Sequence, residues 1–161
     1  MPQDMFLKID GIPGESQDKT HKDEIQILSY SFGAQQSGSA GIGGGSGVGK
    51  VHIQDFQFTK FIDKSSPKLF EACATGLHDK SAVFTCRKAG GTQQEYLKFT
   101  LSGAMVSSVS NATSGDETLP LETFSLNFNK IEIEYHPQDA KGGLGGAVHG
   151  GWDLVKNQKL A

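Results

Sequence analysis

The sequence predicts a mainly β protein, a closed antiparallel β-barrel with one short α-helix and long glycine-rich loops. Apolar residues alternate with polar ones over several short segments, as expected for strands whose two faces differ. In three of these segments the apolar positions change parity partway. One clear helix signal interrupts the series of strands.

The changes of parity indicate curved strands. Side chains in a strand alternate with a period of two, so a change of parity needs an extra residue, a bulge or a sharp bend, as at the corners of a barrel. The alternative is a tight turn between two strands, but Gln54-Asp55 and Asn129-Lys130 lack the glycine that two-residue hairpins favour. The apolar sets are Ile25 and Ile27 then Leu28, Tyr30 and Phe32; Val51 and Ile53 then Phe56 and Phe58; and Phe124, Leu126 and Phe128 then Ile131, Ile133 and Tyr135.

The remaining strands are short and separated by turn chemistry. Glycine-containing turns are expected at 89–92 and at Ser102-Gly103. The expected strands are 5–9, 24–33, 51–58, 82–87, 96–101, 105–110 and 124–135.

The helix is predicted at about Pro67–Thr75. Ser65 provides a cap, proline suits the first turn, and Gly76 ends the helix. Its apolar residues recur at spacings of three and four, so we expect it to plug or cover the barrel. The residues of that stripe are Leu69, Ala72 and Cys73.

Three segments are expected to lack regular structure within a single domain of residues 1–161. Residues 11–22 form an extended polar and charged loop, of a length that is often functional in compact domains. Residues 34–49 form a glycine-rich loop, with seven glycines among residues 38–49. Residues 137–161 are expected to be a flexible C-terminal tail, although Trp152 indicates that its end docks somewhere.

Composition and charge exclude some classes of function. A length of 161 residues supports one sizeable core, and a formal charge of −3 argues against a nucleic-acid binder. The start of the chain lacks the basic and apolar regions of a signal peptide, so we expect synthesis in the cytoplasm. In that reducing compartment Cys73 and Cys86 are expected to be free thiols.

No set of residues predicts catalysis, a cofactor or a metal. Residues 44–50 have the glycines and lysine of a phosphate-binding loop, but Val51 replaces the magnesium-binding hydroxyl and a strand follows where a helix is needed. The spacing of Cys73, His78 and Cys86 does not match the short ligand pairs of structural zinc sites. The functional residues are therefore expected on surfaces.

Neutral polar side chains dominate the strand faces opposite the apolar ones. Such a face can stay wet while another protein rests on it or slides over it, because no full charge has to be desolvated. An ordinary solvent-exposed face is the alternative. The residues are Ser29, Ser31, Gln54, Gln57, Asn127 and Asn129.

The chain resembles the haemolysin-coregulated proteins (Hcp), the tube subunits of the bacterial type VI secretion system, nearly from end to end. The Gly-Glu-Ser-Gln-Asp-Lys-Thr-His run at 14–21 is the most specific motif. Tyr30 and Phe32 stand where close relatives often have tryptophan. Further matching segments are 5–9, 36–39, 49–51, 58–60, 62–65, 87–91, 95–97, 106–110, 126–128 and 151–152.

The resemblance implies a structural protein that is exported without being an enzyme and without a cofactor. Six copies of such a protein close into a ring, and stacked rings form a tube that is expelled with a spike protein at its tip. The lumen holds and protects effector cargo, and sheath and baseplate proteins are further partners. The chain is then expected in the bacterial cytoplasm before firing and outside the cell or in a target cell afterwards.

Two sets of residues are assigned to these roles. The extended loop is expected to contact neighbouring subunits or rings through Glu15, Ser16, Asp18, Lys19, His21 and Lys22. Strand parity is used to place a second set on the lumen, namely Ser29, Ser31, Gln54 and Asn127.

Two other classes of function remain as alternatives. A glycan-binding β-barrel or adhesin subunit would need exposed aromatic platforms. A small hydrolase or nucleotide-binding enzyme would need the His, Cys or Lys50 elements to converge.

Overall fold

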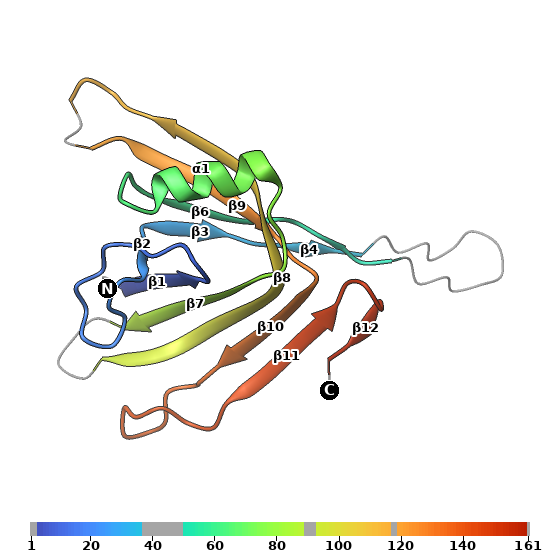
Figure 1. Cartoon of the computed structure of the whole chain (residues 1–161). Coiled ribbons are helices and arrows are strands. Elements are labelled where there is room, and N and C mark those ends of the chain that lie inside the picture. Colours follow the sequence, from blue (N-terminus) through green and yellow to red (C-terminus); the bar gives the residue numbers. More distant parts are fainter. Residues whose placement is uncertain (1–2, 37–49, 89–92, 117–118, 161) are drawn as a thin grey trace.

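The computed structural model describes residues 3–36, 50–88, 93–116 and 119–160, which form a bent antiparallel β-sheet with one α-helix (Figure 1). This confirms the expected mainly β class. The elements of the described residues are β1 Gln3–Ile9, β2 Ile25–Ile27, β3 Ser29–Ser31, β4 Ala34–Gln35, β5 His52–Ile53, β6 Phe56–Phe61, α1 Ser66–Thr75, β7 Lys80–Lys88, β8 Gln94–Ala112, β9 Leu121–Asn127, β10 Lys130–Tyr135, β11 Val148–Asp153 and β12 Gln158–Lys159.

Strand β8 is shared by the two halves of the sheet (Figure 1). Its first part pairs with β7 and β10 in the order β12-β11-β10-β8-β7-β1-β2, and its second part pairs with β9 in the order β8-β9-β6-β3. The strand pairing ends at β2 and at β12, so the described strands form no closed barrel. Strands β4 and β5 form a separate two-stranded ribbon.

The three changes of parity are bends in extended chain, as the barrel-corner interpretation predicted, and not hairpins. Before Leu28 the chain forms β2, which pairs with β1. After Leu28 it forms β3, which pairs with β6. At Gln54-Asp55 it passes from the β4–β5 ribbon into β6. At 128–129 it passes along β8, because β9 and β10 pair with successive parts of that strand.

The turn expected at Ser102-Gly103 is wrong, because both residues lie inside the 19-residue strand β8. Gly103 has a φ of 63°, and a Cβ there would lie 2.4 Å from the side-chain nitrogen of Asn129. Glycine thus permits a bend in β8 at the point where β9 passes into β10.

Helix α1 begins one residue before the predicted start and ends as predicted. The N–H of Gly76, at a φ of 67°, donates to the carbonyls of Ala72 and Cys73 and closes the helix. Leu69 and Ala72 are buried in the core cluster, so the helix lies on the core side of the sheet.

The expected flexible tail is wrong for residues 148–153. All six residues of β11 pair with β10, and Trp152 lies opposite Ile131. Gly151 allows a close approach here, because a Cβ would lie 2.8 Å from Leu160 Cδ1. The glycine next to Trp152 therefore serves close packing against Leu160, and the end of the chain is docked on β10.

The glycine-rich loop predicted at 34–49 can be judged only in part. Residues 34–35 form β4 and pair with 52–53, so the loop is shorter at its start than expected. Residues 37–49 lie outside the described residues, and this range includes most of the phosphate-loop-like segment 44–50. The turn predicted at 89–92 also lies outside the described residues.

The core is dominated by packed aromatic rings. Phe56 stacks on Phe58 with centroids 4.7 Å apart and meets Phe99 edge-on at 5.0 Å. Tyr30 and Phe32 pack against the same group, Tyr30 on Phe84 at 4.9 Å and Phe32 on Phe56 at 5.1 Å. The apolar positions of the three bent strands thus meet in one core. No helix in the described part of the chain is long and apolar enough to cross a membrane.

Candidate functional site

The loop 11–22 lies against the chain that leads into β2. The N–H groups of Gly14 and Ser16 donate to the carbonyls of Asp23 and Glu24 at 2.8 and 3.0 Å. A Cβ at Gly14 would lie 2.5 Å from the Glu24 carbonyl oxygen, so only glycine fits there. The backbone of the loop is therefore fixed at its start.

Arg87 of β7 holds the middle of this loop by charge. Its guanidinium donates two hydrogen bonds to Asp18, at 3.0 and 2.6 Å, and one to Asp4 at 3.1 Å. Arg87 is only 3% exposed, and it also lies over the Phe6 ring at 4.9 Å. The hydrogen bond from Arg87 is the main cause that holds the pKa of Asp18 below its ordinary value, against the opposing effect of burial. Asp18 in turn raises the pKa of Arg87.

His21 holds the far end of the loop. Its ring stacks on Phe6 with centroids 4.5 Å apart. Nδ1 lies 2.9 Å from a Glu24 carboxylate oxygen, and Nε2 lies 2.6 Å from a Glu95 oxygen. The ring thus lies between a carboxylate of the chain that leads into β2 and a carboxylate of β8.

The six loop residues predicted as ring contacts fall into two groups. Glu15, Lys19 and Lys22 are exposed and free to meet a neighbour. The role as ring contacts stays a prediction for all six residues. Ser16 and His21 are buried and Asp18 is bound to Arg87, so these three fasten the loop to its own subunit. The sequence did not identify Arg87 as the partner of Asp18, or Glu95 as a partner of His21. Arg87 also pairs with Asp4.

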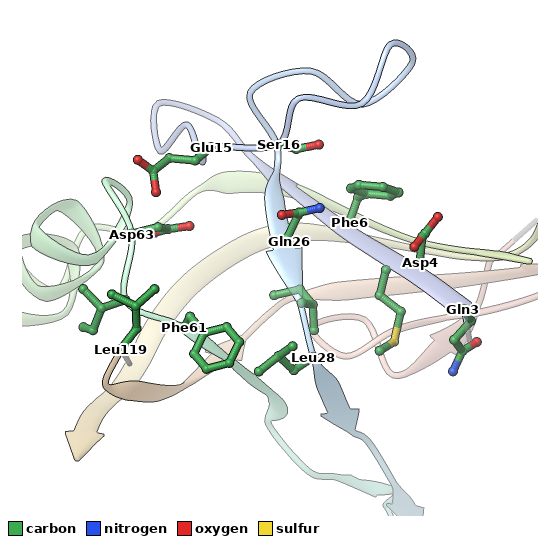
Figure 2. Close-up of a pocket in the computed structure, with 13 residues that line it drawn as sticks. Gln3, Asp4, Phe6, Glu15, Ser16, Gln26, Leu28, Phe61, Asp63 and Leu119 are labelled. Carbon is green, nitrogen blue, oxygen red and sulfur yellow. The ribbon is translucent and has the colours of Figure 1, made fainter. Parts of the chain in front are cut away.

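A pocket of about 420 Å³ opens beside the loop, between β1, β2 and the chain that follows β6 (Figure 2). Figure 2 shows the exposed apolar side chains Leu28, Phe61 and Leu119 along one side, and Glu15 and Ser16 on the other. The pocket therefore combines an apolar wall with carboxylates. Its lining residues are Gln3, Asp4, Met5, Phe6, Glu15, Ser16, Gln26, Ile27, Leu28, Phe61, Ile62, Asp63 and Leu119.

A buried ion cluster lies below the start of α1. Lys60 of β6 is fully buried and donates to Asp63, Ser66 and the Phe61 carbonyl at 2.9, 3.0 and 3.2 Å. These bonds use its three N–H groups, so Glu122, although 2.8 Å from the ammonium, is held by charge alone. Asp63 also accepts from the hydroxyl of Ser65, the residue expected to cap the helix. The cluster fixes the helix to the sheet.

The four residues predicted to face a lumen are all exposed. Ser29, Ser31 and Asn127 lie on the side of the sheet away from the core, and Gln54 lies next to Gly33 at the break before β6. We call this side of β3, β6, β9 and residues 105–112 of β8 the hydroxyl face. Neighbouring strands place its side chains in two rows, which are Ser31, Gln57, Ser125 and Ser108, and Ser29, Thr59, Thr123 and Ser110.

An apolar groove of about 460 Å³ lies at the opposite end of the β3–β6 ribbon from the pocket. The half-buried Trp152 contributes to it, and its shielded indole N–H has no hydrogen-bond partner among the described residues. The lining residues are Phe32, Ala34, Gln36, Val51, Ile53, Ile131, Ile133, Gly150, Gly151 and Trp152.

The described residues bring together no group of three His, Cys, Asp or Glu side chains that could hold a metal ion. Cys73 and Cys86, the cysteines of the candidate set, are free. Burial raises the pKa of the Cys86 thiol to about 12, which opposes its use as a nucleophile.

These features define a class of protein whose candidate functional parts are surfaces: a fastened charged loop, a hydroxyl-rich sheet face and two hollows at its ends. The comparisons with known proteins agree with this class. Residues 6–135 match the family model described as "Type VI secretion system effector, Hcp". The chain therefore belongs to the Hcp family of type VI secretion system proteins.

Relatives match over almost the whole chain. The protein hcp1 of Pseudomonas aeruginosa is 50% identical over 159 residues, which are 98% of either chain. The crystal structure of Hcp1 from Salmonella typhimurium covers 99% of this chain and 100% of its own at 36% identity, with a TM-score of 0.81. A structure described as a type six secretion system protein covers the same shares at 28% identity, with a TM-score of 0.92.

Proposed function

We propose that this chain is a structural, exported subunit of the type VI secretion tube. Six copies close into a ring, rings stack into a tube, and the lumen holds effector proteins during delivery. Membership of the Hcp family over nearly the full length supports this role. The subunit acts through its surfaces and not as an enzyme.

The hydroxyl face is the observation that carries the proposal. One side of the β3-β6-β9-β8 sheet is packed into the core, while the other carries hydroxyl and amide groups in ordered rows, of which Ser125 is buried and the others are at least partly exposed. Such groups bind water well, and a protein surface can replace that water without leaving a full charge desolvated. A lumen lined by Ser29, Ser31, Gln54 and Asn127 would let cargo rest or slide.

The proposed subunit is one domain, residues 1–161, whose wall acts as a closed barrel. Leu28, at the bend between β2 and β3, donates its N–H to the Thr59 carbonyl of β6 at 2.8 Å and so ties the two halves together at that point. Side chains from both halves also contribute to one core cluster.

Exposed charges on the loop would make stacking of rings weak. Surface ion pairs of Glu15, Lys19 and Lys22 are worth about 0–1 kcal/mol each and are screened by salt. Six copies at −3 carry −18 per ring, and this repulsion also favours separate rings. Contacts with spike, sheath or baseplate proteins would then stabilise the tube, which fits a protein assembled in the cytoplasm and exported on firing.

Analytical ultracentrifugation and negative-stain microscopy of the purified protein test this proposal. We expect a species near six times 17.2 kDa and annular particles with an open centre. A compact monomer at high protein concentration would contradict it. The alternative of a glycan-binding barrel would use an exposed aromatic platform, and Trp152 does not provide one, because it is half-buried against the core.

A further inference from the structure

Asp55 is the charged exception beside the otherwise neutral hydroxyl face. Among the described residues of that face, the outward positions of β3, β6, β9 and residues 105–112 of β8 carry no ionisable side chain. Asp55 comes directly before β6 and continues its outward alternation with Gln57 and Thr59. The carboxylate is exposed.

Two neutral donors hold this carboxylate in one orientation. Ser107 of β8 donates to one oxygen at 2.7 Å, and the side-chain amide of Asn127 of β9 donates to the other at 2.9 Å. Asp55 forms no ion pair with any residue in the described part of the chain. Its charge is thus fixed in position and not cancelled, and each oxygen retains a lone pair for a further donor.

We propose that Asp55 is the docking point for lysine and arginine side chains of cargo proteins that lie against the hydroxyl face. This inference rests on the proposed function, because it assigns a chemistry to the cargo of the same lumen. In a ring of six, the Asp55 carboxylates form a collar of negative charge at one height. A concave, narrow surface with charge of one sign raises the local concentration of the opposite charge.

The neutral surroundings make this recognition selective and reversible. The oxygen atoms of neighbouring hydroxyl and amide groups can accept further hydrogen bonds from a guanidinium that is bound at the carboxylate. Cargo with an acidic surface is repelled by the same carboxylate. Each exposed ion pair is weak and screened by salt, so cargo can be released. Several pairs around one ring add their effects, because the second and later contacts are intramolecular.

Fluorescence anisotropy with a labelled hexa-arginine peptide tests the proposal on purified rings. We expect Asp55→Asn to lose most of the affinity, on the order of ten-fold, and the wild-type affinity to fall with rising salt. The matched control is Glu71→Gln, which removes the same charge from the exposed side of α1 on the core side of the sheet. Equal affinity of Asp55→Asn and wild-type rings would overturn the proposal, as would an equal loss in Glu71→Gln.

A gain of charge protects the test against a misfolded variant. Gln57→Glu replaces an amide of the hydroxyl face by a carboxylate of the same shape. We expect this variant to bind the arginine peptide several-fold more tightly. Unchanged or weaker binding would count against the inference. Sedimentation of the same samples separates the two proposals. A monomeric wild type would contradict the proposed ring. Binding by that monomer that depends on Asp55 would still support the docking point.

Discussion

Arg87 and Asp18 are 69 residues apart in the sequence, yet their side chains form a two-pronged ion pair with distances of 3.0 and 2.6 Å. The pair joins the loop 11–22 to the wall strand β7. His21 and Arg87 both pack on the Phe6 ring, and together they turn a loop that looks solvated in the sequence into a fixed part of the surface.

Replacing Asp18 by Asn should destabilise the protein by about 1.5–3 kcal/mol, the range for hydrogen bonds to charged groups. The buried Arg87 would keep only Asp4 as a charged partner. Urea denaturation measures the change. Asp23→Asn is the control, since this exposed loop residue already has a φ of 63°, which asparagine tolerates.

The same pair predicts a pH dependence. The folded state lowers the pKa of Asp18, so the stabilisation is complete above the ordinary aspartate pKa of about 3.9 and is lost as the pH falls toward the lowered value. The stability difference between wild type and Asp18→Asn should therefore be constant near neutral pH and shrink in acid. A difference that grows on acidification would contradict this assignment.

Breaking the buried pair at the base of α1 should be more costly. Lys60→Met leaves Glu122 buried without its cation, which typically costs about 3–5 kcal/mol. The double variant with Glu122→Leu as well should recover much of this loss, because it removes the uncompensated charge. Thermal unfolding of the two variants checks the order; a double variant less stable than the single one would refute it.

Gly14→Ala should disturb the loop at its start. The added methyl would lie 2.5 Å from a backbone oxygen and 2.6 Å from the Cα of Ile25, so the chain must move. We expect a loss of about 1–3 kcal/mol, as for overpacking. Gly115→Ala is the matched control, because nothing lies within 4 Å of its Cβ position, and it should be nearly neutral.

A charge placed on the hydroxyl face should affect cargo and not assembly. Ser31→Lys puts an ammonium group in the row of Gln57 and Ser125. We expect weaker retention of a co-purified effector with unchanged ring size, since Ser31 is exposed. Full retention by the variant would show that Ser31 does not face the cargo.

The two cysteines should differ in reactivity. Burial raises the pKa of Cys86 to about 12, so almost no thiolate forms near neutral pH, while Cys73 is partly exposed on α1. A thiol reagent such as DTNB should label Cys73 in the native protein and Cys86 only after unfolding. Mass spectrometry of the labelled native protein, with Cys73→Ser as control, would reveal any early modification of Cys86.

Local patterns predicted the strands and the helix because each depends on neighbouring residues. The bend at Leu28 follows from the parity of Ile25, Ile27 and Tyr30, and α1 follows from its proline and glycine. Exposure of Ser29 and Ser31 follows from the same alternation.

The structure around a glycine was predicted wrongly where the role of that glycine depends on a distant segment. Gly103 bends a continuous strand because β9 and β10 both run beside β8, and Gly151 admits Leu160 into close contact. Local sequence allows a turn or a flexible tail equally well at such positions. The partners of the loop were missed for a related reason, since Arg87 and Glu95 reach it only through the pairing of β7 with β1 and β8.

Strand β8 links the two halves of the sheet by an unbroken covalent backbone of 19 residues. A mechanical load along this strand is borne by peptide bonds, whereas a load on two separate strands would be borne by the weaker contacts between them. A subunit pushed forcefully through a narrow passage would therefore resist shearing along the seam where its two halves meet.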